Sequence, residues 1–283
     1  MENDRVEDLI IIGSGPAGYT AAVYAAREDF RPLVIGGVPS GGQLMLTSLV
    51  ENYPGFPEGI MGPELMERFK KHAERFGTRF IDDNVTKVDF SKKPLSVGVG
   101  DREYLARCVI ISTGASAKWL GIPSEQRMIG KGVSSCATCD APFFKNKDVI
   151  VVGGGDTAME DSLFLTKFVN SITLVHRRGE FRASKIMQEK VRANPKIKIM
   201  FNTAVEEILG SERVTGARLK DVATGKATDM KAEGVFVAIG HSPNTEFLRG
   251  VLKLDEMGYI VTKDEVKTDI EGVFVAGDVA ERA

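Results

Sequence analysis

Two cysteines separated by two residues, Cys136 and Cys139, are followed directly by an acid, Asp140, near the middle of the 283-residue chain. If the pair lies on a helical turn, its spacing brings both sulfurs to one face, where they can form a disulfide with little backbone movement. The same spacing also occurs in half of a zinc site, which needs two further Cys or His ligands close by. The remaining cysteine, Cys108, and the three histidines are scattered without such spacing. The sequence therefore favours a redox-active dithiol and predicts no metal site.

A nucleotide-binding pattern precedes this dithiol. The apolar run 9–12 predicts a buried parallel strand, and the alanine-rich segment 21–26 predicts a helix. Between them, Gly13 permits a tight turn, Gly15 lets the backbone approach a pyrophosphate, and Gly18 lets the helix pack closely on the strand. Strand, glycine loop and helix together predict a dinucleotide-binding turn.

The segment after the second strand departs from the usual pattern. An acid normally follows that strand and binds the ribose 2′-hydroxyl. Here the apolar segment 32–35 is followed by Gly36, so the first site lacks one expected anchor. Two loops rich in Gly, Pro and polar residues, 40–43 and 51–55, are suited to wrapping a ligand with backbone groups. Turn chemistry alone fits simple surface turns equally well.

A second copy of the pattern follows the dithiol. The apolar run 149–152 leads into a glycine loop at 153–155, a helix that we expect to reach about Phe168, and a strand at 172–175. The position that reads the ribose then carries His176, Arg177 and Arg178, with Arg182 close behind. Guanidinium groups pair with phosphate bidentately, so the sequence favours NADPH over NADH, with a solvated basic turn as the alternative.

The rest of the chain fits a two-domain α/β protein. A helix is predicted from Pro63 to Phe76, and short strands are predicted over 78–111 and 198–239. The segment 115–126 has the composition of a crossover into a second domain. A last apolar strand ends at Asp278, and open α/β sheets bind ligands at that end of their strands.

Composition limits the classes of function. The chain is 43% hydrophobic and 27% charged with a net charge of −2, so its overall charge attracts neither nucleic acid nor acidic membranes. Its apolar runs have the length of strands, and no signal-peptide-like stretch follows the acidic N-terminus. Three cysteines do not form a disulfide framework. We therefore expect a cytoplasmic protein without membrane or nucleic-acid partners, in which Cys108 is buried and inert.

With both glycine loops, the dithiol, the arginines and Asp278 in place, the chain resembles the bacterial-type, low molecular weight thioredoxin reductases from about Asp8 to Asp278. The resemblance implies an α/β fold with two Rossmann-like, three-layer dinucleotide-binding domains, the NADPH domain being inserted in the FAD domain. The implied boundaries place the FAD domain at 1–117 and 246–283 and the NADPH domain with the cysteine pair at 118–245. It also implies a homodimer.

The resemblance assigns roles to individual residues. Cys139 matches the sulfur nearest the flavin, Cys136 the thiol that attacks the partner disulfide, and Asp140 the acid that supplies protons. The implied FAD contacts are Gly13, Ser14, Gly15, Pro16, Ala17, Gly41, Gly42, Gln43, Asn52, Val85, Thr113, Gly114 and Asp278. The implied NADPH contacts are Gly153, Gly155, Asp156, Thr157, His176, Arg177, Arg178, Arg182, Ile239 and Gly240.

The expected function is an NADPH-dependent flavoprotein disulfide reductase. Hydride passes from NADPH to FAD, then reduces the disulfide between Cys136 and Cys139, which reduces thioredoxin. The family alternates between two domain arrangements, and the resemblance implies hinges near 115–119 and 242–245. One alternative is a related reductase that serves another acceptor, such as a peroxide-reducing partner. Another is an NADPH-binding module without flavin or turnover, because family members continue past the position of Asp278 into a helix that faces the flavin.

Overall fold

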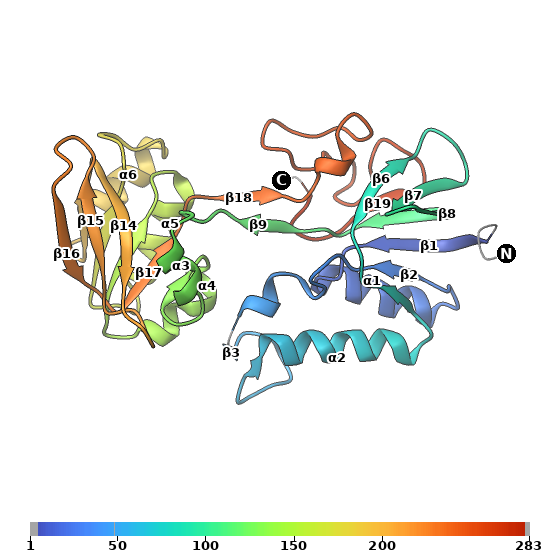
Figure 1. The fold of residues 1–283 in the computed structure, drawn as a ribbon, viewed down its shortest axis with the longest axis horizontal. Coiled ribbons are helices and arrows are strands. Elements are labelled where there is room, and N and C mark those ends of the chain that lie inside the picture. Colours follow the sequence, from blue (N-terminus) through green and yellow to red (C-terminus); the bar gives the residue numbers. More distant parts are fainter. Residues whose placement is uncertain (1–4, 48, 281–283) are drawn as a thin grey trace. The chain divides into compact units, whose positions relative to one another are not determined.

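The computed structural model describes residues 5–47 and 49–280. The chain forms two compact units (Figure 1). The first consists of 1–50, 55–116 and 242–283, and the second consists of 51–54 and 117–241. The second unit is therefore an insertion in the first, and the assignment of one cofactor to each stays a prediction.

A seven-stranded sheet organises the first unit, in the order β5-β2-β1-β8-β7-β6 with β19 paired to β8. The strands paired in parallel are β1 (Val6–Ile12), β2 (Leu33–Ile35), β5 (Arg79–Ile81), β8 (Arg102–Ile111) and β19 (Val273–Val275). An antiparallel extension adds β6 (Val85–Asp89) and β7 (Leu95–Val99). Because β1 lies between β2 and β8, its apolar run is buried on both faces, as the sequence predicted.

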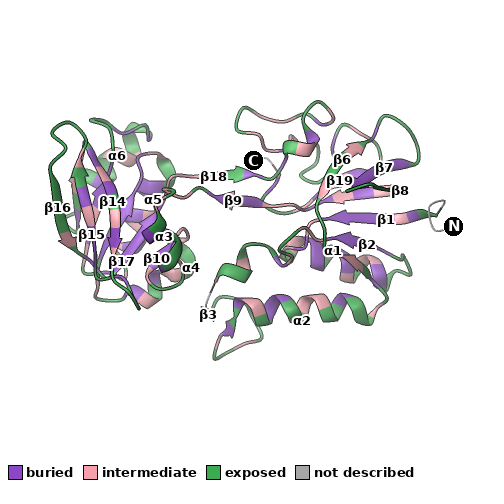
Figure 2. Cartoon of the chain, in the orientation of Figure 1, coloured by how far each residue is buried: buried purple, intermediate pink, exposed green. Residues whose placement is uncertain are grey.

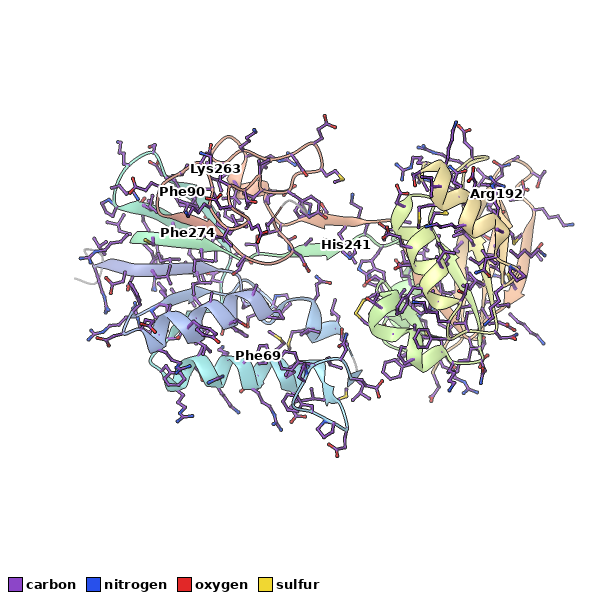
Figure 3. All side chains as sticks on the ribbon, turned by 180° about the vertical axis from the view of Figure 1, so that it is seen from behind. Phe69, Phe90, Arg192, His241, Lys263 and Phe274 are labelled. Carbon is purple, nitrogen blue, oxygen red and sulfur yellow. A yellow bond between two sulfur atoms is a disulfide. The ribbon has the colours of Figure 1, made fainter. Side chains whose placement is uncertain are left out.

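Both faces of this sheet carry a core. On one side, Leu9 and Ile11 pack with Tyr19 of α1 (Pro16–Arg27) and Met66 of α2 (Gly62–Arg75). Ile10 belongs to the cluster on the other side, which includes the buried Phe90, labelled in Figure 3. Smaller elements in this unit are a 3-10 turn at Gly42–Leu46 and the hairpin β3 (Leu49–Val50) and β4 (Ile60–Met61).

The second unit repeats the strand, glycine loop and helix around a parallel five-stranded sheet, in the order β10-β17-β11-β12-β13. These strands are β10 (Val133–Ser134), β17 (Gly234–Val237), β11 (Asp148–Val152), β12 (Ser171–Val175) and β13 (Ile197–Met200). Its helices are α3 (Pro123–Met128), α4 (Ala137–Asp140), α5 (Asp156–Leu165) and α6 (Lys185–Ala193). An antiparallel sheet of β14 (Thr203–Leu209), β15 (Gly216–Asp221) and β16 (Ala227–Lys231) completes it.

Burial follows the central strands of each unit (Figure 2). The regular part of α5 ends at Leu165 rather than near Phe168, where a turn continues the chain. Apart from the segment 51–54, the chain passes between the units through one two-stranded ribbon, β9 (Ala115–Ala117) with β18 (His241–Pro243). In the described part of the chain, no helix is both long and apolar enough to cross a membrane.

Candidate active site

The two cysteines of the predicted dithiol form a disulfide, with 5.4 Å between their Cα atoms. Cys136 is the N-cap of the short helix α4, and Cys139 lies in its only turn. The backbone N–H of Cys139 donates a hydrogen bond to the Sγ of Cys136 over 3.3 Å. Cys139 is exposed and Cys136 is half-buried. The helical turn therefore holds both sulfurs together, as the spacing predicted.

Asp140 follows this turn and is half-buried. Burial raises the pKa of its carboxyl group, and a hydrogen bond from the Ser134 hydroxyl opposes that increase in pKa. Ser134 also accepts a hydrogen bond from the backbone N–H of Cys136 at 3.0 Å. One hydroxyl thus links the acid to the dithiol turn. Sequence reasoning missed Ser134, although its place two residues before Cys136 was a usable signal for a side chain that bonds the local backbone.

The first glycine loop is closed where it packs on the sheet and open where a ligand would approach. The N–H of Gly13 donates to the carbonyl of Ile35 at 2.9 Å. A Cβ at Gly13, whose φ is +114°, would lie 2.3 Å from the carbonyl oxygen of Ser112, and one at Gly18 would lie 2.1 Å from that of Gly13. At Gly15, by contrast, no described atom lies within 4 Å of such a Cβ. The close contacts at Gly13 and Gly18 fit the predicted tight turn and close helix packing, while the approach of Gly15 to a pyrophosphate stays a prediction.

Other predicted FAD contacts in the first unit lie around this loop. A Cβ at Gly42 would lie 3.1 Å from the Cα of Gly15, so the 41–43 loop directly abuts the glycine loop. A Cβ at Gly277 would lie 2.9 Å from that of Ala17, which places the residue before Asp278 at the first turn of α1. The exposed residues of this set are Pro16, Gly42, Gln43 and Asp278.

Four further predicted contacts occupy other positions. Thr113 and Gly114 follow β8, where the Thr113 hydroxyl donates to the carbonyl of Asn244 at 2.8 Å. Val85 is the first residue of β6. Asn52 lies in the segment 51–54, which belongs to the second unit although its neighbours in sequence belong to the first. The structure therefore does not group Asn52 with the first glycine loop.

The second glycine loop has a similar construction. A Cβ at Gly153 would lie 2.3 Å from the carbonyl oxygen of Ala238, whereas Gly155 again has no described atom within 4 Å of such a Cβ. Asp156 begins α5, and its carboxylate accepts two hydrogen bonds from Ser184, each 2.9 Å long. These bonds lower the pKa of Asp156. Thr157 is exposed beside it, and Ile239 and Gly240 are half-buried past the end of β17.

The basic cluster after β12 separates into an exposed and a buried part. Arg177, Arg178 and Arg182 are exposed, and the backbone N–H of Arg182 donates to the carbonyl of Gly154 at 2.8 Å, beside the glycine loop. His176 is buried, and a Cβ at Gly154 would lie 2.2 Å from its ring. Its Nε2 has no hydrogen-bond partner among the described residues. Burial lowers the pKa of His176, and the nearby arginine charges lower it further.

The imidazole of His176 therefore packs against Gly154 and supports the second glycine loop from the interior of the unit. Its ring lies 5.5 Å from that of Phe181, which lies 4.6 Å from that of Phe201. The guanidinium of Arg192, labelled in Figure 3, covers both phenylalanine rings. The sequence run of His and Arg could not reveal that His176 is buried, because its burial depends on contacts with Gly154 and with the ring of Phe181.

The remaining cysteine, Cys108, lies outside the dithiol turn. Cys108 is half-buried in β8 rather than fully buried, because it packs at the edge of the cluster that contains Leu9 and Ile11. Within 5–47 and 49–280, no three His, Cys, Asp or Glu side chains are grouped so that they could hold a metal ion.

Comparisons with known proteins agree with these features. The family model for pyridine nucleotide-disulphide oxidoreductases matches residues 7–283. A thioredoxin reductase of Mycolicibacterium smegmatis is 52% identical over 280 residues, covering 99% of this chain and 90% of that protein. One from Streptomyces coelicolor is 49% identical over 279 residues, covering 98% and 87%. Solved thioredoxin reductases from Streptococcus pyogenes and Giardia duodenalis align with TM-scores of 0.93 and 0.94, at 40% and 38% identity, covering 98% and 99% of this chain and 91% and 92% of theirs.

Proposed function

Because the chain belongs to the pyridine nucleotide-disulphide oxidoreductase family, we infer that it is an NADPH-dependent flavoprotein disulfide reductase of the thioredoxin reductase type. The observation that carries this inference is the disulfide between Cys136 and Cys139, placed in sequence between two open glycine loops. Relatives named thioredoxin reductase, at about half identity over nearly the whole chain, favour this enzyme over a binding module without turnover.

The first glycine loop fits the pyrophosphate of FAD. Gly15 leaves open space at the N-terminus of α1, no described side chain caps that terminus, and its first turn contains no acid. Free N–H groups and the positive end of the helix dipole favour an anion there. Pro16, Gly42, Gln43 and Asp278 are the nearby predicted contacts, while Asn52 is supported by family resemblance alone.

The second glycine loop fits the pyrophosphate of NADPH, because Gly155 leaves open space at the N-terminus of α5 and no described side chain caps that terminus. Asp156 lies in the first turn, where its carboxylate accepts hydrogen bonds from Ser184. Arg177, Arg178 and Arg182 are exposed beside the loop and would hold the 2′-phosphate. His176 would act from beneath the loop rather than by direct contact. When bound, the two cofactors would supply the hydride and electron transfer that the protein's own side chains cannot perform.

The chain's own chemistry is thiol–disulfide exchange. In the reduced dithiol, the Cys136 thiolate attacks one sulfur of the thioredoxin disulfide, which forms a mixed disulfide and releases one partner thiolate. The Cys139 thiolate then attacks the Cys136 sulfur, restores the disulfide between them and releases the second partner thiolate. The two partner thiolates are protonated as they leave, and Cys136 and Cys139 lose two protons when their thiols become thiolates, so the exchange moves two protons and consumes none overall. The choice of Cys136 as the attacking thiol follows the family.

Asp140 is placed to supply these protons. Because burial raises its pKa, a larger fraction of the carboxyl group keeps its proton near neutral pH than in water. An acid beside the dithiol can therefore protonate a leaving thiolate and be reloaded from solvent. Thioredoxin as the substrate, a homodimer and a cytoplasmic location belong to the same proposal, and they are supported by the relatives' names and by the family.

The test is the full chain loaded with FAD, supplied with NADPH and oxidised thioredoxin. We expect NADPH oxidation that depends on thioredoxin, with two thiols appearing for each NADPH consumed. Oxidation of NADPH by oxygen without thiol formation would contradict the proposal. A different acceptor, such as a peroxide-reducing protein, replacing thioredoxin as the preferred substrate would favour the related reductase instead.

A further inference from the structure

Ser14 lies in the first glycine loop, and its side chain is buried, at 3% relative exposure. Its hydroxyl donates a hydrogen bond to the carbonyl of Gly36 at 2.6 Å. It accepts another from the backbone N–H of Gly41 at 2.8 Å. These two partners lie 22 and 27 positions further along the chain. A single hydroxyl thus bonds both the turn at Gly36 and the 41–43 loop.

A buried tyrosine lies near this hydroxyl. Tyr19, on the first turns of α1, is 2% exposed, and its phenol group lies near the hydroxyls of Ser14 and Ser40. A serine hydroxyl has one donor and two acceptor positions. Gly36 uses the donor of Ser14, and Gly41 uses one acceptor position. The donor of Ser14 is therefore already used within the protein.

The space around Gly36 depends on this arrangement. A Cβ at Gly36 would lie 3.1 Å from the Cβ of Ser14 and 3.2 Å from its Oγ, and also 3.2 Å from the Cβ of Ser40. An acidic side chain at this position would crowd both serines. The same close packing therefore accounts for two features. It leaves no room at position 36 for the usual ribose-binding acid, and it holds the hydroxyl of Ser14 in its buried position.

We propose that Ser14 is a positioning residue whose hydroxyl joins the glycine loop, the Gly36 turn and the 41–43 loop into one preformed site. The proposal rests on the proposed function in that this site would bind FAD. Ser14 acts on FAD through the backbone of Gly41 and its neighbours, and not by contact. Removing its hydroxyl leaves the buried N–H of Gly41 and the half-buried carbonyl of Gly36 without this partner, which loosens the 41–43 loop.

Hydrogen exchange of the FAD-free full chain tests whether Ser14 holds the 41–43 loop, and it does not depend on enzyme activity. Ser14→Ala should speed exchange in the segment 37–46 by roughly tenfold, the equivalent of losing one or two net hydrogen bonds. Ser112→Ala is the matched control, because Ser112 is also a buried serine that bonds the glycine loop, through the carbonyls of Ile12 and Gly13. It should leave the exchange of 37–46 within about twofold of the wild type, since those bonds do not reach Gly41.

A second measurement uses pairwise coupling. Gly36→Ala should destabilise the wild type through the close contacts with Ser14, and the same substitution should be better tolerated in Ser14→Gly, where those atoms are absent. Strictly additive effects on the midpoint of urea unfolding would overturn the packing part of the proposal. If Ser14→Ala does not fold, Ser14→Cys keeps a side chain of similar shape with a weaker donor and acceptor, and it should still speed exchange in 37–46.

FAD binding separates this proposal from the proposed function. If the wild type binds FAD, Ser14→Ala should weaken binding by about fivefold to tenfold, and Ser14→Thr, which keeps a hydroxyl, should weaken it less. A wild type that binds no FAD would contradict the proposed function. The exchange experiment would still test whether the Ser14 hydroxyl holds the 41–43 loop. Unchanged exchange of 37–46 in Ser14→Ala, or an equal effect in Ser112→Ala, would overturn the inference.

Discussion

The backbone N–H of Cys139 points at the Sγ of Cys136 and donates to it over 3.3 Å. After reduction, this donor would stabilise negative charge on the Cys136 sulfur, because a hydrogen bond to a charged group is stronger than one to a neutral group. The reverse contact, from the N–H of Cys136 to the other sulfur, does not form, since that N–H donates to the Ser134 hydroxyl. The turn thus distinguishes two cysteines that are close in sequence.

This asymmetry predicts different behaviour of the two single variants. Cys136→Ser and Cys139→Ser should both abolish turnover with thioredoxin. Reduced Cys139→Ser should accumulate a mixed disulfide with a single-cysteine thioredoxin whose thiol has first been capped as a disulfide with a small aromatic thiol. The stabilised Cys136 thiolate attacks the protein sulfur, and the small thiolate leaves. Mass spectrometry of the trapped complex is the measurement.

Cys108→Ser is the control for these variants and should keep normal turnover, because Cys108 lies in β8 and outside the dithiol turn. Trapping by Cys136→Ser instead of Cys139→Ser would show that the nucleophile is assigned to the wrong sulfur.

The second prediction concerns the choice of nucleotide. Arg177→Ala and Arg178→Ala each remove a charge-assisted contact worth roughly 1.5–3 kcal/mol, so each should raise the KM for NADPH at least about tenfold. The KM for NADH should change little, because NADH lacks the 2′-phosphate. Steady-state kinetics with both nucleotides measures the difference.

Arg213→Ala is a matched control for the arginine variants, since Arg213 is equally exposed in the same unit but follows β14 instead of β12. It should leave both KM values unchanged. An equal loss for NADPH and NADH in the Arg177 variant would mean that this arginine supports the fold or the pyrophosphate.

The sequence predicted the repeated strand, loop and helix well, because glycine spacing and apolar runs are local signals. Gly13 and Gly153 have the close contacts that the pattern requires. The pairing of β9 with β18 could not be predicted, since it joins segments more than 120 positions apart and depends on how the second unit closes. The assignment of 51–54 to the second unit escaped prediction for the same reason.

Side-chain direction at the ends of strands was also beyond the sequence. His176 and the arginines after it form one basic run, yet the ring of His176 is buried against Gly154. Ser14 was predicted as a cofactor contact, and its hydroxyl is bonded within the protein. In both cases the decisive neighbours come from other loops, whose positions depend on tertiary packing.

The third prediction concerns the proton donor. The folded state raises the pKa of Asp140, so it holds a proton at pH values where the unfolded chain has released one. The free energy of unfolding of the wild type should therefore fall as pH rises from the unfolded pKa of about 3.9 through the folded value. In urea unfolding, Asp140→Asn should lose only the part of that fall that Asp140 contributes, because Asp161, whose pKa is also raised, keeps its own part. The same variant should reduce turnover by about 10²-fold or more.

Ser134→Ala provides an internal comparison for Asp140. It removes the hydrogen bond that opposes the increase in pKa, so the carboxyl group should titrate at higher pH and the pH dependence of turnover should move with it. A shift toward lower pH, or Asp140→Asn with full activity, would contradict a proton-donor role.

The last prediction concerns Asp161, a half-buried residue of α5 that follows the exposed Glu160. The pKa of Asp161 is raised to about 6, mainly by burial and to a smaller extent by the negative charge of Glu160. The folded state therefore holds a proton that the unfolded chain releases at lower pH, and stability falls as pH rises from about 4 to about 6. Above that range, Asp161→Asn should be more stable than the wild type by up to roughly 3 kcal/mol, and by less where solvent reaches the carboxyl group. Below about pH 4 the two proteins should unfold at the same urea concentration.

Glu160→Gln, which removes only the neighbouring charge, should give a smaller gain in stability and should move the pH range over which stability falls to lower pH. A stability difference between Asp161→Asn and the wild type that is the same at pH 4 and pH 8 would show that the carboxylate is not responsible.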